Sequence, residues 1–147
     1  MGDKAPEFKL ASTSGRMVSL SDYKDKAVIL YFYPKDFTPG CTQEACDFRD
    51  GHAALKKKGA IVLGVSPDPV EKHQEFVKEY QLPFELLSDP DHTAAKNFGV
   101  YGQKTLYGRT FMGVQRSTFC IDPEGKVKAV FPKVKVDGHV QEVLDCL

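Results

Sequence analysis

A strand that stops at a proline and is followed almost at once by a helix start is the feature that most constrains the fold of this chain. Residues 27–33 read AVILYFY, a β-branched and aromatic run typical of a buried strand. Pro34 ends that run because it has no amide hydrogen for a ladder. Thr38 is a favoured N-cap and Pro39 suits the first helical position. The sequence therefore predicts strand, short turn and helix in immediate succession.

The same segment places Cys41 in the first turn of the predicted helix. First-turn amides lack intrahelical partners, and the field of the helix favours negative charge there. That environment favours the thiolate, which is the nucleophilic form of cysteine. Buried cysteines more often act as small apolar side chains, but an apolar filler does not need a helix start. Cys41 is therefore a candidate nucleophile.

Strand-like and helix-like segments alternate along the chain, which indicates one α/β domain over residues 1–147. A chain of this length buries enough surface to fold without disulfides. A strand, helix and strand over residues 27–65 predict a crossover with parallel strands. The remaining predicted elements are a hairpin at 8–20, helices at 40–58, 67–80, 89–98 and 140–147, strands at 84–87, 117–121 and 126–131, and an irregular excursion at 99–114.

The composition and charge of the chain limit the kinds of partner that the protein can bind. The chain has 20 basic and 20 acidic residues, so no net field attracts nucleic acid or an anionic membrane. It shows no apolar run near about 18 residues and no signal-peptide layout, so we expect a cytoplasmic protein. In that reducing compartment, cysteines tend to be catalytic, metal-binding or incidental. No metal site is expected, because the scattered histidines lack ligand spacing and are expected at the surface: His52, His73, His92 and His139.

A longer pattern resembles a known family over nearly the whole chain. Pro34-x-x-x-Thr38-x-x-Cys41 is followed by Glu44 and Cys46, and Arg116 opens a late strand as RSTF. This pattern resembles the peroxiredoxins, most closely the bacterioferritin comigratory protein or peroxiredoxin Q branch. The resemblance implies a thioredoxin-like fold with an N-terminal hairpin and inserted elements, whose central mixed sheet is flanked by helices. It also implies a peroxidase that reduces hydrogen peroxide and organic hydroperoxides without a metal or organic cofactor.

The resemblance assigns a role to each residue of the pattern. Cys41 corresponds to the peroxidatic cysteine, and Arg116 and Thr38 correspond to donors that hold the thiolate and the peroxide. Displacement at a peroxide oxygen needs such donors, because charge builds up on the leaving oxygen. Pro34 would screen the sulfur from water, and Glu44 would orient the arginine. Each has a simpler reading as well, since Thr38 caps a helix, Pro34 ends a strand, and Glu44 and Arg116 could be solvated charges.

Cys46 corresponds to the resolving cysteine, which forms a disulfide with Cys41 that thioredoxin or a similar dithiol then reduces. Five helical residues rise about 7.5 Å and rotate about 140°, so the two Cα atoms should lie roughly 8 to 9 Å apart. A disulfide requires less than about 7 Å. The first turns of the helix must therefore unwind before the two sulfurs bond. The alternative is a buried helix residue in a one-cysteine peroxidase that uses an external thiol.

Other functions fit the cysteines less well. The interval from Cys41 to Cys46 begins a plant-type ferredoxin pattern, but the next cysteine is Cys120. A thiol-disulfide oxidoreductase usually presents Cys-x-x-Cys, which is missing. A peroxide sensor or holdase on the same fold stays open. We expect Cys120 to serve in packing, Cys146 to be exposed and incidental, and the protein to be a monomer or at most a weak dimer.

Overall fold

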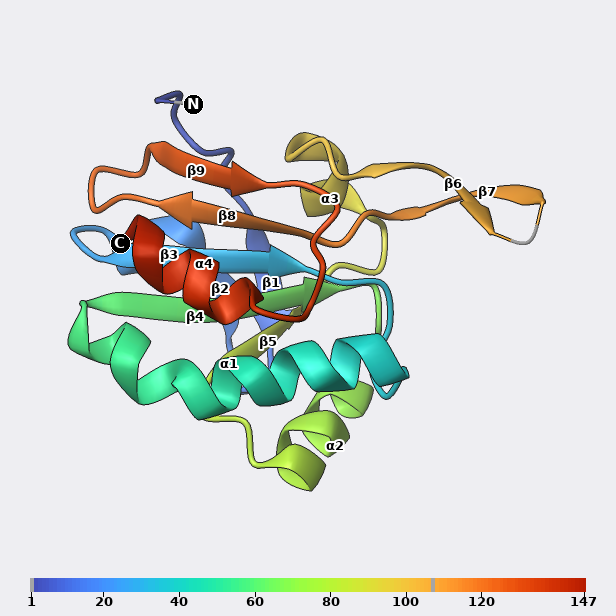
Figure 1. Cartoon of the computed structure of the whole chain (residues 1–147), viewed down its shortest axis with the longest axis horizontal. Coiled ribbons are helices and arrows are strands. Elements are labelled where there is room, and N and C mark those ends of the chain that lie inside the picture. The colour runs from blue at the N-terminus through green and yellow to red at the C-terminus, as the bar shows by residue number, and fades with distance from the viewer. Residues whose placement is uncertain (1, 107) are drawn as a thin grey trace.

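The computed structural model describes residues 2–106 and 108–147. A seven-stranded sheet of order β2-β1-β5-β4-β3-β8-β9 forms its centre, and helices cover both faces (Figure 1). The strands of this sheet are β1 (Lys9–Ser12), β2 (Met17–Ser19), β3 (Ala27–Phe32), β4 (Ala60–Ser66), β5 (Glu85–Ser88), β8 (Ser117–Ile121) and β9 (Val127–Phe131). The helices are η1 (Leu20–Tyr23), α1 (Pro39–Lys57), α2 (Val70–Tyr80), α3 (Thr93–Asn97) and α4 (His139–Cys146).

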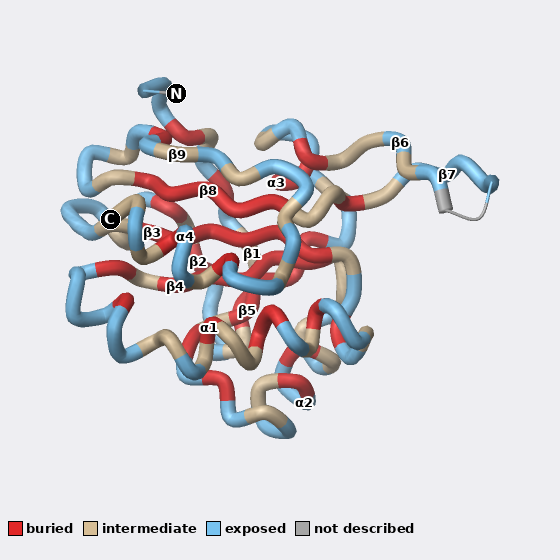
Figure 2. The backbone as a smooth tube through the Cα atoms, in the orientation of Figure 1, coloured by how far each residue is buried: buried red, intermediate tan, exposed pale blue. Residues whose placement is uncertain are grey.

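The sheet is mixed, as the sequence predicts. β3 pairs in parallel with β4, and β4 pairs in parallel with β5, which gives the expected crossover through α1. The other neighbour of β3 is β8, which runs antiparallel to it and continues into β9. The central position of β3 explains its composition, because both faces of that strand are covered (Figure 2).

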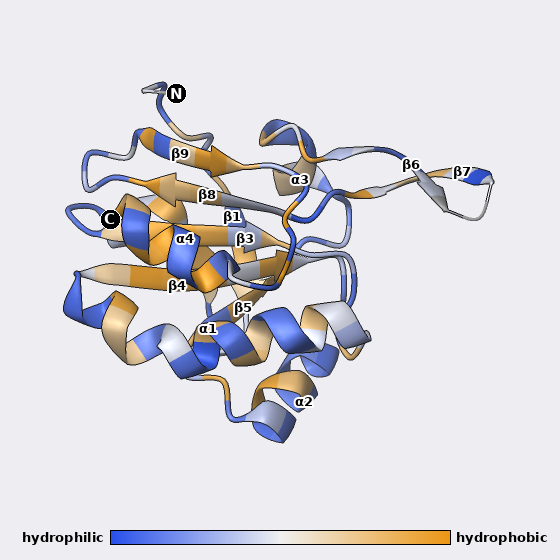
Figure 3. Ribbon diagram, in the orientation of Figure 1, coloured by the Kyte–Doolittle hydropathy of each residue, from blue (hydrophilic) through white to orange (hydrophobic). Residues whose placement is uncertain are grey.

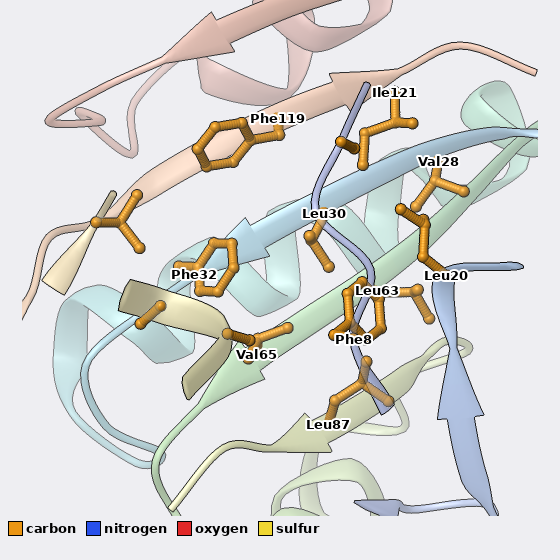
Figure 4. Close-up of a cluster of buried hydrophobic side chains, with 14 of the residues drawn as sticks. Phe8, Leu20, Val28, Leu30, Phe32, Leu63, Val65, Leu87, Phe119 and Ile121 are labelled. Carbon is orange, nitrogen blue, oxygen red and sulfur yellow. The ribbon is translucent and has the colours of Figure 1, made fainter. Parts of the chain in front are cut away.

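Alternate residues of β3 serve two separate apolar layers. Ile29 and Tyr31 point toward α1, α2 and α4, which pack together on one face. Leu30 and Phe32 point to the other face, where α3 and the N-terminal segment cover the sheet. Figure 4 shows this second layer, with Phe119 and residues of β4 and β5 around it. The helices α1, α2 and α4 turn polar residues outward, so hydropathy changes from one side of each of these helices to the other (Figure 3).

The predicted irregular segment at 99–114 is wrong. It contains a second, two-stranded sheet made of β6 (Tyr101–Leu106) and β7 (Arg109–Val114), which projects from the body of the molecule (Figure 1). The glycines that suggested a loop fit the hairpin, since Gly102 pairs with Gly113 and Gly108 takes a φ of +76° near the turn. Local pairing between adjacent strands outweighs their low strand propensity.

Candidate active site

The loop between β3 and α1 is built as the sequence predicts, with one difference at Thr38. Thr38 occupies the N-cap position of α1 and Pro39 follows at the first helical position. The Thr38 side chain makes no capping bond to the helix, and instead its hydroxyl donates to the Lys35 carbonyl at 2.8 Å. The side chain therefore closes the loop on itself, while Thr38 occupies the N-cap position that the sequence predicts. Pro34 lies half-buried, two residues after the end of β3.

Cys41 lies in the first turn of α1 and its residue is only 1% exposed. Arg116, 75 residues further along the chain, reaches it from the segment just before β8, and its Nη2 lies 3.2 Å from the Cys41 Sγ. Gly40 makes room for this contact, because a Cβ at that position would stand 3.1 Å from the same Nη2. The sequence indicates Gly40 only as a backbone amide near the sulfur, and its close approach to Arg116 depends on a side chain distant in sequence.

The second branch of the Arg116 guanidinium binds Glu44. Nη1 donates to the Glu44 Oε1 at 2.6 Å, so one arginine links the carboxylate and the sulfur. Glu44 is buried, and burial raises its pKa to about 7, although the charge of Arg116 acts in the opposite direction. Among the described residues, neither the other oxygen of Glu44 nor the Tyr31 hydroxyl has a hydrogen-bond partner.

Cys46 is half-buried on α1, one and a half turns beyond Cys41, and both are free thiols. Burial raises the pKa of the Cys46 thiol, while the charge of Arg49 lowers it. The helix runs unbroken through both cysteines, so their separation is that of an intact helix, as the sequence predicts.

The other two cysteines lie near each other on the α4 side of the sheet. Cys120 is buried in β8, which agrees with the predicted packing role. Cys146 is half-buried rather than exposed, because the apolar face of α4 lies on the sheet. Burial raises the pKa of the Cys120 thiol, and the neighbouring Cys146 thiol raises it further.

Two histidines predicted at the surface are buried. His139 contacts the Thr118 hydroxyl through Nε2 at 2.7 Å. His73 lies among Tyr33, Asp36 and Asp68. A signal for His73 was present in the sequence, since it lies three residues before Phe76 on the inner face of α2.

A hollow of about 660 Å³ lies away from Cys41. It is bordered by the second half of α1, α2 and β5, with His52, Val77 and Phe84 among its lining residues. The cysteine site is instead a small, nearly closed position at a helix start. Among the described side chains, it is the position that brings a buried sulfur, a fixed cation and a carboxylate together, which makes it the candidate site.

Known proteins share this architecture. The model of the AhpC/TSA family matches residues 1–130. A putative peroxiredoxin bcp from Coxiella burnetii is 56% identical over 144 residues, which cover 98% of this chain and 95% of that protein. Peroxiredoxin Bcp from Bacillus subtilis is 50% identical over all 147 residues and 94% of its own length. The solved structure of peroxiredoxin Q from Xanthomonas campestris covers 94% of this chain and 87% of its own, with 40% identity and a TM-score of 0.89.

The chain therefore belongs to the AhpC/TSA family, and its fold is the thioredoxin-like fold of peroxiredoxins. It is an enzyme, a thiol peroxidase, and the resemblance to the bacterioferritin comigratory protein and peroxiredoxin Q branch is confirmed. A hydroperoxide substrate and a thioredoxin-type reductant follow from this membership. None of the described helices has both the length and the hydropathy that crossing a membrane demands.

Proposed function

We propose that Cys41 is the sulfur that attacks the peroxide and that Arg116 holds it ready to react. The observation that carries this assignment is the bifurcated arginine contact, with one nitrogen 3.2 Å from the sulfur and the other 2.6 Å from Glu44. A guanidinium does not titrate in the working range, so it presents a positive charge to the sulfur at every relevant pH. Glu44 fixes the plane of the guanidinium, and so acts through the arginine.

The first step is a displacement at oxygen. The Cys41 thiolate attacks one peroxide oxygen, the oxygen-oxygen bond breaks, and the leaving oxygen departs with a proton as water or an alcohol. The sulfur is oxidised to a sulfenic acid. Arg116 and the amides of the first turn would stabilise the charge on the leaving oxygen, and the Thr38 hydroxyl would orient the peroxide. Pro34, which has no donor, would limit access of water.

The second step joins Cys41 to Cys46. The Cys46 thiol displaces water from the sulfenic acid, and a disulfide forms. Because both residues belong to one continuous helix, the first turns of α1 must unwind for the sulfurs to meet. The unwound disulfide is accessible to a dithiol such as thioredoxin, which returns both sulfurs to thiols.

The substrate class extends to organic hydroperoxides. A solved structure of the Xanthomonas campestris bacterioferritin comigratory protein, 39% identical to this chain, is described in connection with alkyl peroxide reduction. We further propose that residues 1–147 act as one domain, as a monomer or at most a weak dimer, in the cytoplasm.

The test is stopped-flow reduction of hydrogen peroxide and cumene hydroperoxide, coupled to a thioredoxin system and followed by peptide mapping of the oxidised protein. Wild-type protein should turn over and yield a Cys41–Cys46 peptide pair. Cys46→Ser should react once with peroxide, stop at the sulfenic acid and form no intramolecular bridge. An intramolecular bridge from Cys41 in that variant would refute the resolving role of Cys46.

A further inference from the structure

A buried polar group lies behind the loop that precedes Cys41, outside the site described above. It consists of Tyr33, Asp36 and His73, none more than 1% exposed. The Tyr33 hydroxyl donates to the Asp36 Oδ1 at 2.6 Å, and the His73 Nδ1 lies 2.5 Å from the Asp36 Oδ2. The other ring nitrogen of His73, Nε2, lies 3.0 Å from the Leu87 carbonyl oxygen.

These partners determine where the protons are. A carbonyl oxygen only accepts, so the His73 Nε2 must carry hydrogen. One further proton has to lie between Nδ1 and the Asp36 Oδ2, because two bare acceptors would repel each other at that distance. The pair is thus joined by a short hydrogen bond in a site closed to water, where such bonds are at their strongest.

The loop before Cys41 contacts α2 at a second residue, Phe37, next to Asp36. Phe37 adopts a φ of +66°, which a bulky residue keeps only when its surroundings hold it. Its ring packs edge-on against Phe76, with 4.9 Å between centroids. His73 and Phe76 are three residues apart and share one face of α2. Two successive loop residues, Asp36 and Phe37, are therefore held by one face of one helix.

The helix α1 is also anchored in the core after the two cysteines, at Phe48. Phe48 is fully buried, stacks on Tyr31 with 4.7 Å between centroids, and meets His139 edge-on at 6.0 Å. The segment 38–47 lies between this anchor and the loop contacts, and it contains both Cys41 and Cys46. Unwinding that brings the sulfurs together is confined to a segment held at both ends.

We propose that Asp36 and His73 are positioning residues that form a latch, holding the loop before Cys41 on α2 and so setting how readily the first turns of α1 unwind. The inference rests on the proposed function, in which Cys46 reaches the oxidised Cys41 only after unwinding. The latch makes no contact with Arg116 or Glu44 in the described hydrogen bonds. Weakening it therefore speeds disulfide formation and leaves the attack on peroxide unchanged.

Two substitutions at one position separate the bonds of His73. The amide nitrogen of Gln takes the place of Nε2, so His73→Gln keeps the bond to Leu87 and loses the one to Asp36. His73→Asn does the opposite, since its amide nitrogen takes the place of Nδ1. Phe37→Ala is a third variant, which removes the second contact with α2 at a residue that is 42% exposed and so leaves the core intact.

The reaction is followed by rapid mixing with hydrogen peroxide, timed quenching with a thiol-alkylating reagent and mass analysis, because the chain has no tryptophan to report on the steps. Disulfide formation should be about tenfold faster in His73→Gln, as loss of one buried hydrogen bond implies, and about threefold faster in Phe37→Ala. It should stay within about twofold of wild type in His73→Asn. Loss of the Cys41 thiol should proceed at the wild-type rate in all three variants.

The latch is refuted if disulfide formation is unchanged in both His73→Gln and Phe37→Ala, or if His73→Asn is accelerated as much as His73→Gln. It is also refuted if both steps slow together, which is what general damage to the fold would cause. These outcomes leave the proposed function intact as long as wild-type protein forms the Cys41–Cys46 disulfide. Failure of the wild-type protein to form that disulfide would remove the proposed function and the latch together.

Discussion

Cys41 and Cys120 are equally buried, each 1% exposed, yet their surroundings are opposite in kind. Cys41 lies at a helix start with a guanidinium nitrogen 3.2 Å from its sulfur. Cys120 lies on β8, between β3 and the edge strand β9, where burial raises its pKa and the charge of Lys128 is the smallest of the influences on it. Burial alone therefore does not decide whether a cysteine reacts. In the proposed mechanism, the charge placed beside the sulfur decides it.

The largest difference in peroxidase activity is expected between the variants that replace Cys41 and Cys120 one at a time. Cys41→Ser should lower peroxidase activity by at least about 10³-fold, because a serine hydroxyl is not ionised at neutral pH. The matched variant Cys120→Ser should keep activity within about twofold and lose on the order of 1 kcal/mol of stability, since it buries a hydroxyl. Coupled peroxidase assays measure the activities, and chemical denaturation measures the stabilities. Comparable activity losses in both variants would abolish the distinction.

The next test removes the cation beside Cys41. Arg116→Gln should slow the reaction with peroxide by about 10² to 10³-fold, the usual cost of losing one donor to a developing negative charge. Arg109→Gln is the matched control, because Arg109 is exposed on β7. Its rate should equal that of wild type in single-turnover stopped flow. A reduction of the same size in both variants would show that general charge, rather than the contact with Cys41, matters.

The third test measures how much the burial of the Glu44 carboxyl, which Arg116 links to Cys41, changes the free energy of unfolding. The pKa of Glu44 is about 7 in the folded protein, raised by burial from an ordinary value of 4.5. Between about pH 4.5 and 7 the folded protein holds a proton that the unfolded chain has lost, so stability falls as pH rises. Relative to Glu44→Gln, the wild-type free energy of unfolding should fall on the order of 3 kcal/mol across this range, as measured by urea denaturation. Parallel curves for the two proteins would contradict the assignment.

The smallest effect is expected at Cys146, the half-buried neighbour of Cys120. Cys146→Ala removes a thiol that no proposed step uses. Both the reaction with peroxide and disulfide formation should stay within about twofold of wild type, and stability should change by less than about 1 kcal/mol. A clear fall in single-turnover rate would mean that the sheet side of the molecule takes part in the chemistry.

Elements set by local sequence could be predicted well. The strand, turn and helix around Cys41 follow from a hydrophobic run, a proline and a cap within a few residues. The position of Arg116 could not be worked out from local pattern, because it depends on β8 pairing with β3. Only resemblance to a family pointed to Arg116 beforehand, and the contact at Cys41 agrees with that expectation.

The burial of His73 and the hairpin of β6 and β7 were not predicted, because both depend on contacts between segments. A histidine among polar neighbours looks like a surface residue, and the free-energy cost of burying His73 is offset by Asp36 and the Leu87 carbonyl, which are distant in sequence. The hairpin at β6 and β7 depends on the pairing of two neighbouring segments. Its glycines lower the strand propensity of each segment, and the pairing of the two segments cannot be seen in either segment alone.

The most direct measurement of the central claim is to treat the reduced protein with one equivalent of hydrogen peroxide, block the remaining thiols and identify the oxidised sulfurs by peptide mapping. The field beside Cys41 predicts that oxidation begins at that residue, captured as the sulfenic acid at early times and as the bridge to Cys46 later. Oxidation of Cys120 to a similar extent in the same time would contradict it, because the two sulfurs differ in their neighbours and not in their burial.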